Sequence, residues 1–309
     1  MRATLAIAAI GVVILLSVNA WTQESSLTPL PMRIEKVKEG LFVIRGPGLP
    51  CSSRTGCGPG TVDDGVLHEP GDVAVRVTSE GVIVVDDKYA HNAAEVLEKV
   101  RSVSSQPIRY LLNTHHHADH ASGNPMILDM GIDIIGHRNI RENFIKTKQP
   151  GAPPIVFSDK AAVFVGGVEV QLHYFGRGHT NGDTVIYFPD LRTIHAGDLV
   201  IDGMPYLDYE GGGSFLEWIP TLKKMLALDF DTVIPGHGPV LSRAYVVDRI
   251  GKMEVLVQRM RELVKRRVPK DQLAAQLKID DLGWTKTVST QGFISRALGP
   301  FYEEVAAAR

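Results

Sequence analysis

The sequence predicts an α/β protein contained in one domain from about residue 32 to 309, and two sheets flanked by helices would fit its pattern of elements. Short β-branched runs alternate with segments of helical period, no linker or repeat interrupts them, and metal-ligand types of residue follow four strand-like runs. Binding groups are commonly carried at strand ends on a rigid sheet. With 44% hydrophobic residues and a formal net charge of -2, the chain has an ordinary globular composition and no bulk signal for nucleic-acid binding.

The first half of the chain contains five strand-like runs and one helical segment. The turn Ser79–Gly81 divides one long β-branched stretch into two strands. Apolar residues at helical spacing predict a helix over residues 91–105. The expected strands are "LFVIRGPG" (41–48), two within "DVAVRVTSEGVIVVDDKY" (72–89), "IRYLLN" (108–113) and "GIDIIGH" (131–137).

The second half is expected to form a hairpin, two further strands, a helix, a last strand and a basic helical region. Gly166 and Gly167 mark the hairpin turn. Ser214, with Glu217 three residues later, is a capping pattern for the helix. The segments are "AAVFVGGVEVQLHYF" (161–175), "DTVIYFPDLRTIHAGD" (183–198, joined at Pro189–Asp190), "SFLEWIPTLKKMLAL" (214–228), "DTVIPGHG" (231–238) and helices from about residue 243.

The N-terminus has the pattern of a secretory signal peptide over residues 1–20. Arg2 precedes an apolar stretch, and small residues at Val18 and Ala20 provide a cleavage site before Trp21. The apolar core is short for a membrane span of about 20 residues. We therefore expect a secreted or periplasmic protein without stable membrane insertion after cleavage, with an uncleaved anchor as the alternative.

The two cysteines, Cys51 and Cys57, lie close together in "CSSRTGC" within a loop rich in Gly, Pro and Ser. In an exported protein such a pair is expected to close a small disulfide loop. A soft-metal site is the alternative, and it is weaker because no histidine lies nearby.

Four strand-like runs lead directly into residues of metal-ligand type. "NTHHHADH" at 113–120 contains four of the eleven histidines and an aspartate, and a run this polar cannot be core. The other three runs lead to His179 in "GRGHTNGD", Asp198 in "RTIHAGD" and His237 in "PGHG". Glycines beside His179 and His237 fit tight turns in which the backbone approaches an ion closely.

Imidazole and carboxylate together suit Zn²⁺, with manganese or iron as alternatives. Seven candidates exceed the four donors of one tetrahedral zinc, so the sequence predicts two metals that share a bridging carboxylate and a bridging water. Scattered surface histidines are the other interpretation, and the ordered H-x-H-x-D-H run makes it the weaker one. The candidates are His115, His117, Asp119, His120, His179, Asp198 and His237.

This motif set resembles that of the metallo-β-lactamase superfamily of metal-dependent hydrolases, which includes glyoxalase II-like and β-lactamase-like members. The resemblance covers roughly residues 32–242. It implies an αβ/βα four-layer sandwich with the metal site along one edge of the two sheets. It also implies a first metal on His115, His117 and His179, a second on Asp119, His120 and His237, and a bridge at Asp198.

Zinc β-lactamases usually carry Cys or Ser at the position of Asp198. A bridging Asp is more similar to glyoxalase II, the lactonases and a broad group of exported hydrolases. The name of the fold therefore does not supply the substrate of this chain.

The expected function is an exported dinuclear zinc hydrolase. Zinc lowers the pKa of bound water to around 7, so a hydroxide between two metals would attack a carbonyl or phosphoryl centre at neutral pH. Asp119 is the expected catalytic residue, because it would orient the nucleophile as well as hold the second metal. The expected partner is a small-molecule substrate, namely an ester, thioester, lactone or amide, with a β-lactam as a candidate for secondary activity.

Two alternatives come from other functional classes. A mononuclear iron persulfide dioxygenase resembles this fold and uses a subset of the same ligands. Similar exported members are linked to periplasmic oxidation systems, which gives a metal-binding accessory protein as the second alternative. Diiron flavoprotein oxidases usually place Glu at the position of His117, and nucleases are disfavoured by the predicted export.

Tyr206 and Tyr209 lie in "GMPYLDYEGGGS", shortly after Asp198. A phenol there either contacts the substrate, by hydrogen bonding to a developing oxyanion, or packs beneath the loop. The remaining histidines of the strand regions are expected to be packed or hydrogen-bonded, and His116 is expected to point away from the metals. These histidines of the strand regions are His137, His173 and His195.

Overall fold

The computed structural model describes residues 31–47, 49–50, 67–285 and 288–308. The predicted signal peptide and both cysteines, Cys51 and Cys57, lie outside the described residues. Among the helices that are described, none is both long enough and apolar enough to cross a membrane.

One sheet contains seven strands in the order β1-β2-β5-β6-β7-β8-β9. The strands from β1 to β6 pair antiparallel, whereas β6 to β9 run parallel. Parallel neighbours need crossover connections, and helices α1, α3 and α4 lie in these connections. The strands are β1 (Arg33–Lys38), β2 (Leu41–Arg45), β5 (Val73–Val77), β6 (Val82–Val85), β7 (Ile108–Leu112), β8 (Asp133–His137) and β9 (Ile155–Phe157).

The second sheet contains six strands in sequence order, β10 to β15. All neighbours pair antiparallel except β13 and β14. The expected hairpin is confirmed, with Val165 opposite Val168 across the two glycines. The strands are β10 (Lys160–Val165), β11 (Val168–Tyr174), β12 (Thr184–Phe188), β13 (Thr193–His195), β14 (Thr232–Ile234) and β15 (Leu241–Ser242), and β3 (Leu49–Pro50) pairs separately with β4 (Leu67–His68).

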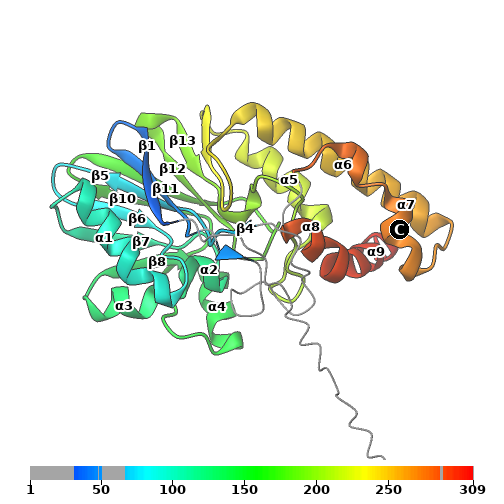
Figure 1. Ribbon diagram of the computed structural model, residues 1–309, viewed down its shortest axis with the longest axis horizontal. Coiled ribbons are helices and arrows are strands. Elements are labelled where there is room, and N and C mark those ends of the chain that lie inside the picture. The colour runs from blue at the N-terminus through cyan, green and yellow to red at the C-terminus, as the bar shows by residue number, and fades with distance from the viewer. Residues whose placement is uncertain (1–30, 48, 51–66, 286–287, 309) are drawn as a thin grey trace, which may run out of the picture.

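Helices cover the outer face of each sheet, which gives four layers (Figure 1). Helices α1, α3 and α4 belong to the first half, and α5, α6 and the C-terminal helices pack on the second sheet. The α-helices are α1 (Ala93–Val103), α2 (Ala118–Ala121), α3 (Asn124–Asp129), α4 (Arg138–Thr147), α5 (Phe215–Met225), α6 (Arg243–Lys265), α7 (Leu273–Leu277), α8 (Val288–Gly292) and α9 (Leu298–Ala307), and a π-helical segment spans Phe293–Ala297.

Alternating residues of the first sheet enter different cores. Val73 and Val75 pack toward α1, whereas Ala74 faces the second sheet. Ile186 and Ile234 of the second sheet complete the core between the sheets. Both faces of these strands are therefore buried, as their continuous apolar runs require.

The predicted α/β sandwich is confirmed. The first expected strand is preceded by β1, and the expected last strand is followed by β15. Helix α5 begins as predicted, because the Ser214 hydroxyl accepts a hydrogen bond from the amide of Glu217. Helices α3 and α4 were not expected.

Candidate metal centre

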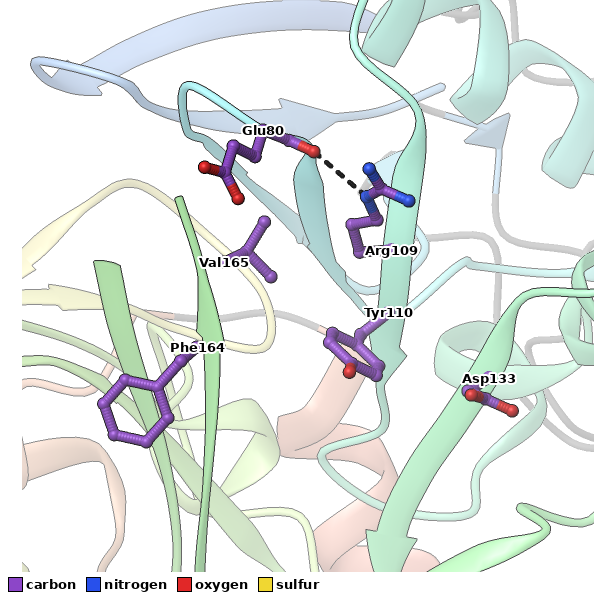
Figure 2. Close-up of a pocket in the computed structure, with 6 residues that line it drawn as sticks. All are labelled: Glu80, Arg109, Tyr110, Asp133, Phe164 and Val165. Atoms are coloured by element: carbon purple, nitrogen blue, oxygen red, sulfur yellow. Dashed lines mark hydrogen bonds between the residues drawn. The ribbon is translucent and has the colours of Figure 1, made fainter. Parts of the chain in front are cut away.

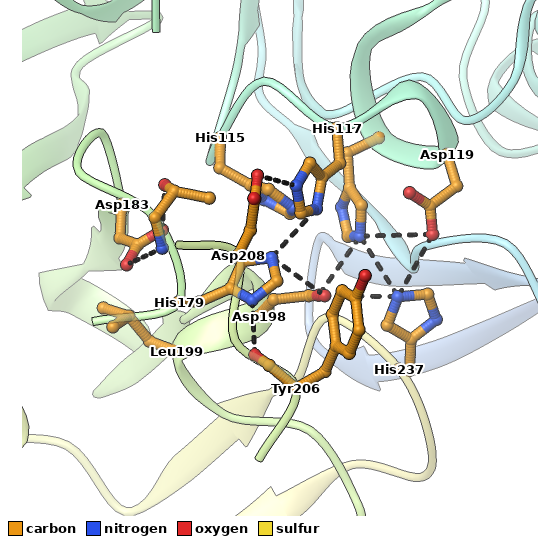
Figure 3. A network of polar contacts seen from close by, with 12 residues as sticks. His115, His117, Asp119, His179, Asp183, Asp198, Leu199, Tyr206, Asp208 and His237 are labelled. Atoms are coloured by element: carbon orange, nitrogen blue, oxygen red, sulfur yellow. Dashed lines mark hydrogen bonds and ion pairs between the residues drawn. The ribbon is translucent and has the colours of Figure 1, made fainter. Parts of the chain in front are cut away.

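The side chains of the candidate metal residues lie together in one region of the structure, and Figure 3 shows most of them. Strand β7 leads into the segment that holds His115 and His117, and then into α2, which carries Asp119 and His120. The remaining three residues follow β11, β13 and β14, and they are His179, Asp198 and His237.

The structure brings the seven residues into two adjacent clusters. In the first cluster, four potential ligand atoms from His115, His117, His179 and Asp198 lie within 4.8 Å of one another. In the second, the ligand atoms of Asp119, His120 and His237 meet the same limit. These groups match the two ligand sets that the resemblance implies.

Asp198 lies between the two clusters. Its Oδ2 atom is 3.5 Å from Nε2 of His179 in the first cluster. Its Oδ1 atom is 3.2 Å from Nε2 of His120 and 3.4 Å from Nε2 of His237 in the second. One carboxylate oxygen therefore faces each cluster.

In each histidine of the first cluster, the ring nitrogen that does not face the cluster contacts an oxygen of the protein. For His115, Nδ1 lies 3.0 Å from the hydroxyl of Thr114. For His117, Nε2 lies 2.9 Å from Oδ2 of Asp208, and Nδ1 of His179 lies 2.7 Å from the carbonyl oxygen of Tyr206. Such contacts fix the tautomer and ring orientation of metal-binding histidines.

The second cluster has its own supporting oxygens. Nδ1 of His120 lies 2.9 Å from Oδ2 of Asp86, which is fully buried. The same carboxylate accepts hydrogen bonds from the amide and hydroxyl of Thr114, so it also supports the first cluster. Nδ1 of His237 lies 2.9 Å from the carbonyl oxygen of Glu69.

Carboxylates favour positive charge on some of the imidazoles in both clusters. In the first cluster, the hydrogen bond to Asp208 raises the pKa of His117 in spite of its burial. Burial lowers the pKa of His115, and it lowers the pKa of His179 to about 4, so both imidazoles are neutral at pH 7. Burial opposes the charged form of His120 as well, but the carboxylates of Asp198 and Asp119 outweigh it and raise the pKa to about 10. A metal cation would replace this positive charge, because binding of a metal displaces protons from its ligands.

The residues present fit metal ions. Nε2 of His115 is buried and has no hydrogen-bond partner among the residues that the structure describes. Such an orphaned polar atom is costly, and a cation within the first cluster would satisfy it. Imidazole nitrogens and carboxylate oxygens are donors suited to zinc, manganese or iron.

Glycines bring the strand-end loops close to these side chains. A Cβ atom at Gly236 would overlap Oδ1 of Asp198, and one at Gly71 would overlap the ring of His120. The glycine beside His237, Gly236, therefore lets the backbone approach Asp198, which is another candidate ligand.

Sequence reasoning missed three buried or half-buried carboxylates. Asp86 follows strand β6, so the strand-end pattern could have indicated it. Asp208 lies in an irregular loop that no local pattern marks. Asp183 accepts hydrogen bonds from the amide and hydroxyl of Thr180 and shapes the turn after His179, and burial raises its pKa to about 7.

The two tyrosines have different surroundings. The ring of Tyr206 lies beside the clusters, with its centroid 5.8 Å from that of His179 (Figure 3). The hydroxyl of Tyr209 instead donates a hydrogen bond of 2.7 Å to Oε2 of Glu304, and its ring packs against the core beneath the loop. Only Tyr206 therefore stands at the site.

The other histidines have the structural contacts expected of them. His137 bonds to the carbonyl of Ser158, and His173 to the side chain of Gln171. His195 bonds to the carbonyl of Asp72. For His116, the neighbours are the side chain of Asn143 and, at 3.6 Å, Oδ2 of Asp208.

A surface pocket of about 370 Å³ has none of the candidate metal residues in its lining. Figure 2 shows the residues that line it. Its lining includes Arg109 and Tyr110 at the start of β7, whereas the metal residues follow the end of that strand. The full lining is Glu80, Arg109, Tyr110, Asp133, Phe164 and Val165. This pocket is not part of the candidate metal centre.

Two curated proteins illustrate the sequence relationships of the chain. The alpha subunit of 2,4-dinitroanisole O-demethylase from Nocardioides sp. (strain JS1661) is 28% identical over 188 residues, which cover 59% of this chain but only 56% of that protein. A metallo-β-lactamase type 2 from Bacillus sp. (strain 170) is 26% identical over 178 residues, covering 55% of this chain and 68% of that enzyme.

Solved structures share the fold. A metallo-β-lactamase from Pontibacter korlensis superposes with a TM-score of 0.62 at 17% identity, covering 72% of this chain and 99% of that one. The DIM-1 metallo-β-lactamase exposed to ceftazidime gives a TM-score of 0.62 at 20% identity, covering 74% and 98%. The family model of the metallo-β-lactamase superfamily matches residues 61–237, more than half of the chain and all seven candidate metal residues. The chain therefore belongs to the metallo-β-lactamase superfamily of metal-dependent hydrolases.

Proposed function

We propose that this chain is an exported hydrolase that holds two zinc ions and cleaves a small ester, thioester, lactone or amide. The observation that carries the proposal is the position of Asp198, whose two oxygens face two separate clusters. A carboxylate between two complete donor sets is what a dinuclear site requires, whereas a single zinc needs four donors.

When bound, the two ions would supply Lewis acidity and an activated water at neutral pH. In the first set, the chain would contribute His115, His117 and His179, with Asp198 shared. Asp119, His120 and His237 would form the second set. Asp119 is the proposed catalytic residue, and the supporting oxygens would keep each imidazole oriented.

The substrate would approach from the side of the site that is open. The side chains of His117, Asp119 and His237 are 21%, 17% and 23% exposed, whereas that of His120 is fully buried. Tyr206 stands beside this opening, so its phenol would be able to donate a hydrogen bond to an oxygen that gains charge during the reaction.

The relatives support several classes of substrate without choosing among them. The metallo-β-lactamase from Bacillus sp. (strain 170) makes a β-lactam a substrate to test, although Asp198 is more similar to the bridging residue of glyoxalase II and the lactonases. The name of the Nocardioides relative adds an aryl methyl ether to the classes that we propose to test. The proposed partner is a small molecule in each case.

A substrate panel combined with metal analysis tests the proposal. The mature protein should contain close to two equivalents of zinc and hydrolyse at least one of an ester, a thioester, a lactone, a β-lactam or an aryl methyl ether. A single tightly held iron would instead support the alternative persulfide dioxygenase. Two metals with no turnover of any substrate would support the accessory metal-binding protein.

A further inference from the structure

One wall of the metal centre is the loop formed by residues 202–213. This loop supplies two of the three supporting oxygens of the first cluster, the Oδ2 atom of Asp208 and the carbonyl of Tyr206. It has no regular secondary structure, so its position depends on what holds it from outside.

Helices beyond the family match help to hold this loop, which α4 also contacts through a hydrogen bond of 2.7 Å from Lys146 to the carbonyl of Glu210. Buried Arg249 of α6 donates hydrogen bonds to the carbonyls of Ile201 and Gly203 at the start of the loop. Glu304 of α9 accepts the hydroxyl hydrogen bond of Tyr209, at 2.7 Å, in the middle of it. The superfamily match ends at residue 237, so these contacts come from a part of the chain that the family pattern does not include.

The Glu304 carboxylate is itself held at the N-terminus of α5. It accepts hydrogen bonds from the amides of Phe215 and Leu216, at 3.1 and 3.4 Å, and from the hydroxyl of Ser214. Unpaired amides and the helix dipole favour a negative charge at this position. Glu304 therefore has a fixed location from which it can hold Tyr209.

Tyr209 directly follows Asp208 in the sequence. The contact that fixes Tyr209 therefore also limits the position of Asp208, which contacts a metal residue. The amide of Asp208 donates to the carbonyl of His179 at 3.0 Å, and the amide of Gly213 donates to the carbonyl of Asp208 at 2.8 Å. The Asp208 side chain then meets Nε2 of His117. A displaced Tyr209 would therefore move the carboxylate that orients His117.

We propose that Glu304 is a positioning residue for the first metal set. Its contact with Tyr209 holds the loop so that Asp208 and Tyr206 orient His117 and His179. This inference rests on the proposed two-metal function. The second set is supported by Asp86 and the Glu69 carbonyl, and none of the Glu304 contacts described above reaches those residues, so the effect should be selective for one metal.

The test is a zinc titration of metal-free protein in competition with a chelator. Glu304→Gln keeps the side-chain size but replaces one acceptor by an amide donor, and Tyr209→Phe removes only the link to the loop. Both variants should weaken one of the two zinc-binding steps by about tenfold or more, as expected when an oriented supporting group is lost. Glu303→Gln, on the same helix but exposed and paired with Lys270, is the matched control and should bind zinc as the unmodified chain does.

Two backgrounds identify the affected set. In a His120→Ala chain, where the first set remains, Glu304→Gln should still weaken the remaining zinc. In a His115→Ala chain it should leave the remaining zinc unchanged. Thermal unfolding of the metal-free variants separates positioning from stability, because a purely structural role lowers the melting temperature without changing zinc affinity.

The outcomes of the inference and of the proposed function are distinguishable. If the unmodified chain takes up fewer than two zinc ions, the dinuclear proposal fails, while the remaining binding step still reports on Glu304. If Glu304→Gln and Tyr209→Phe both bind zinc like the unmodified chain, the positioning role is wrong. Should Glu304→Gln fail to fold, the Tyr209→Phe result alone decides the matter.

Discussion

Replacing Asp198 by Asn tests the bridging role directly. The two side chains have nearly the same size, but Asn has one acceptor oxygen and no charge. In the structure, one oxygen of Asp198 faces His179 and the other faces His120 and His237. An amide nitrogen in either position cannot ligate a cation, so one cluster loses a donor whichever way the amide turns.

The size of the effect follows from charge as well as from donor number. A unit charge about 4 Å from another contributes about 4 kcal/mol at an effective dielectric constant near 20. A hundredfold decrease in kcat corresponds to about 2.7 kcal/mol, so the loss of this charge is large enough to produce it. We expect Asp198→Asn to weaken the second zinc and to lower kcat at least about a hundredfold.

The assay combines zinc titration with kinetics on the best substrate of the panel. Circular dichroism should show an unchanged fold, because the cores between and outside the sheets do not include Asp198. A folded variant that keeps two zinc ions and near-normal turnover would refute the bridging role and, with it, the two-metal mechanism.

Three further predictions concern other parts of the chain. Gly71→Ala should displace the ring of His120 and weaken only the second zinc; equal weakening of both steps in a titration would contradict this. Cys51 and Cys57 should form a disulfide worth about 2–3 kcal/mol in the exported protein, and two free thiols by intact mass would rule it out. Burial lowers the pKa of His173 to about 4, below its value of about 6.5 in unfolded chains, so native stability should fall as the pH decreases from about 6.5 to 4. The free energy of unfolding, measured with urea, should differ less between pH 7 and pH 5 in His173→Gln than in the unmodified chain. An identical difference in both proteins would show that this histidine does not contribute.

The strands that carry the site could be predicted because their apolar runs are unambiguous. The strand β1 was missed because it is an edge strand with alternating charges and none of its residues is fully buried, as is common for edges. Helix α4 was missed for a different reason. Its cap is His137, which accepts a bond from the Asn139 amide, and histidine is not among the residues that mark helix starts in a sequence.

The candidate metal residues were chosen from their types and their places after strands, and the structure brings them together, whereas most of the groups that support them could not be predicted. For His179 and His237, the supporting atoms are main-chain carbonyls of Tyr206 and Glu69. Any residue type provides such an oxygen, so no side-chain pattern can mark it. For Tyr209 the sequence left open a substrate role and a packed position beneath the loop, and its hydroxyl donates a hydrogen bond to Glu304.

The supporting groups divide the metal centre in a way that the ligand residues alone do not reveal. Asp208 and the Tyr206 carbonyl serve the first set, and the Glu69 carbonyl serves the second. Asp86 reaches both, through Thr114 to His115 and directly to His120. Changes in the loop at 202–213 should therefore weaken metal binding by the first set and leave the second set unchanged. Changes at Asp86 should weaken metal binding by both sets. Since helices beyond the family match help to hold that loop, we expect changes in those helices to alter one of the two proposed metal sites while the ligand motif stays the same.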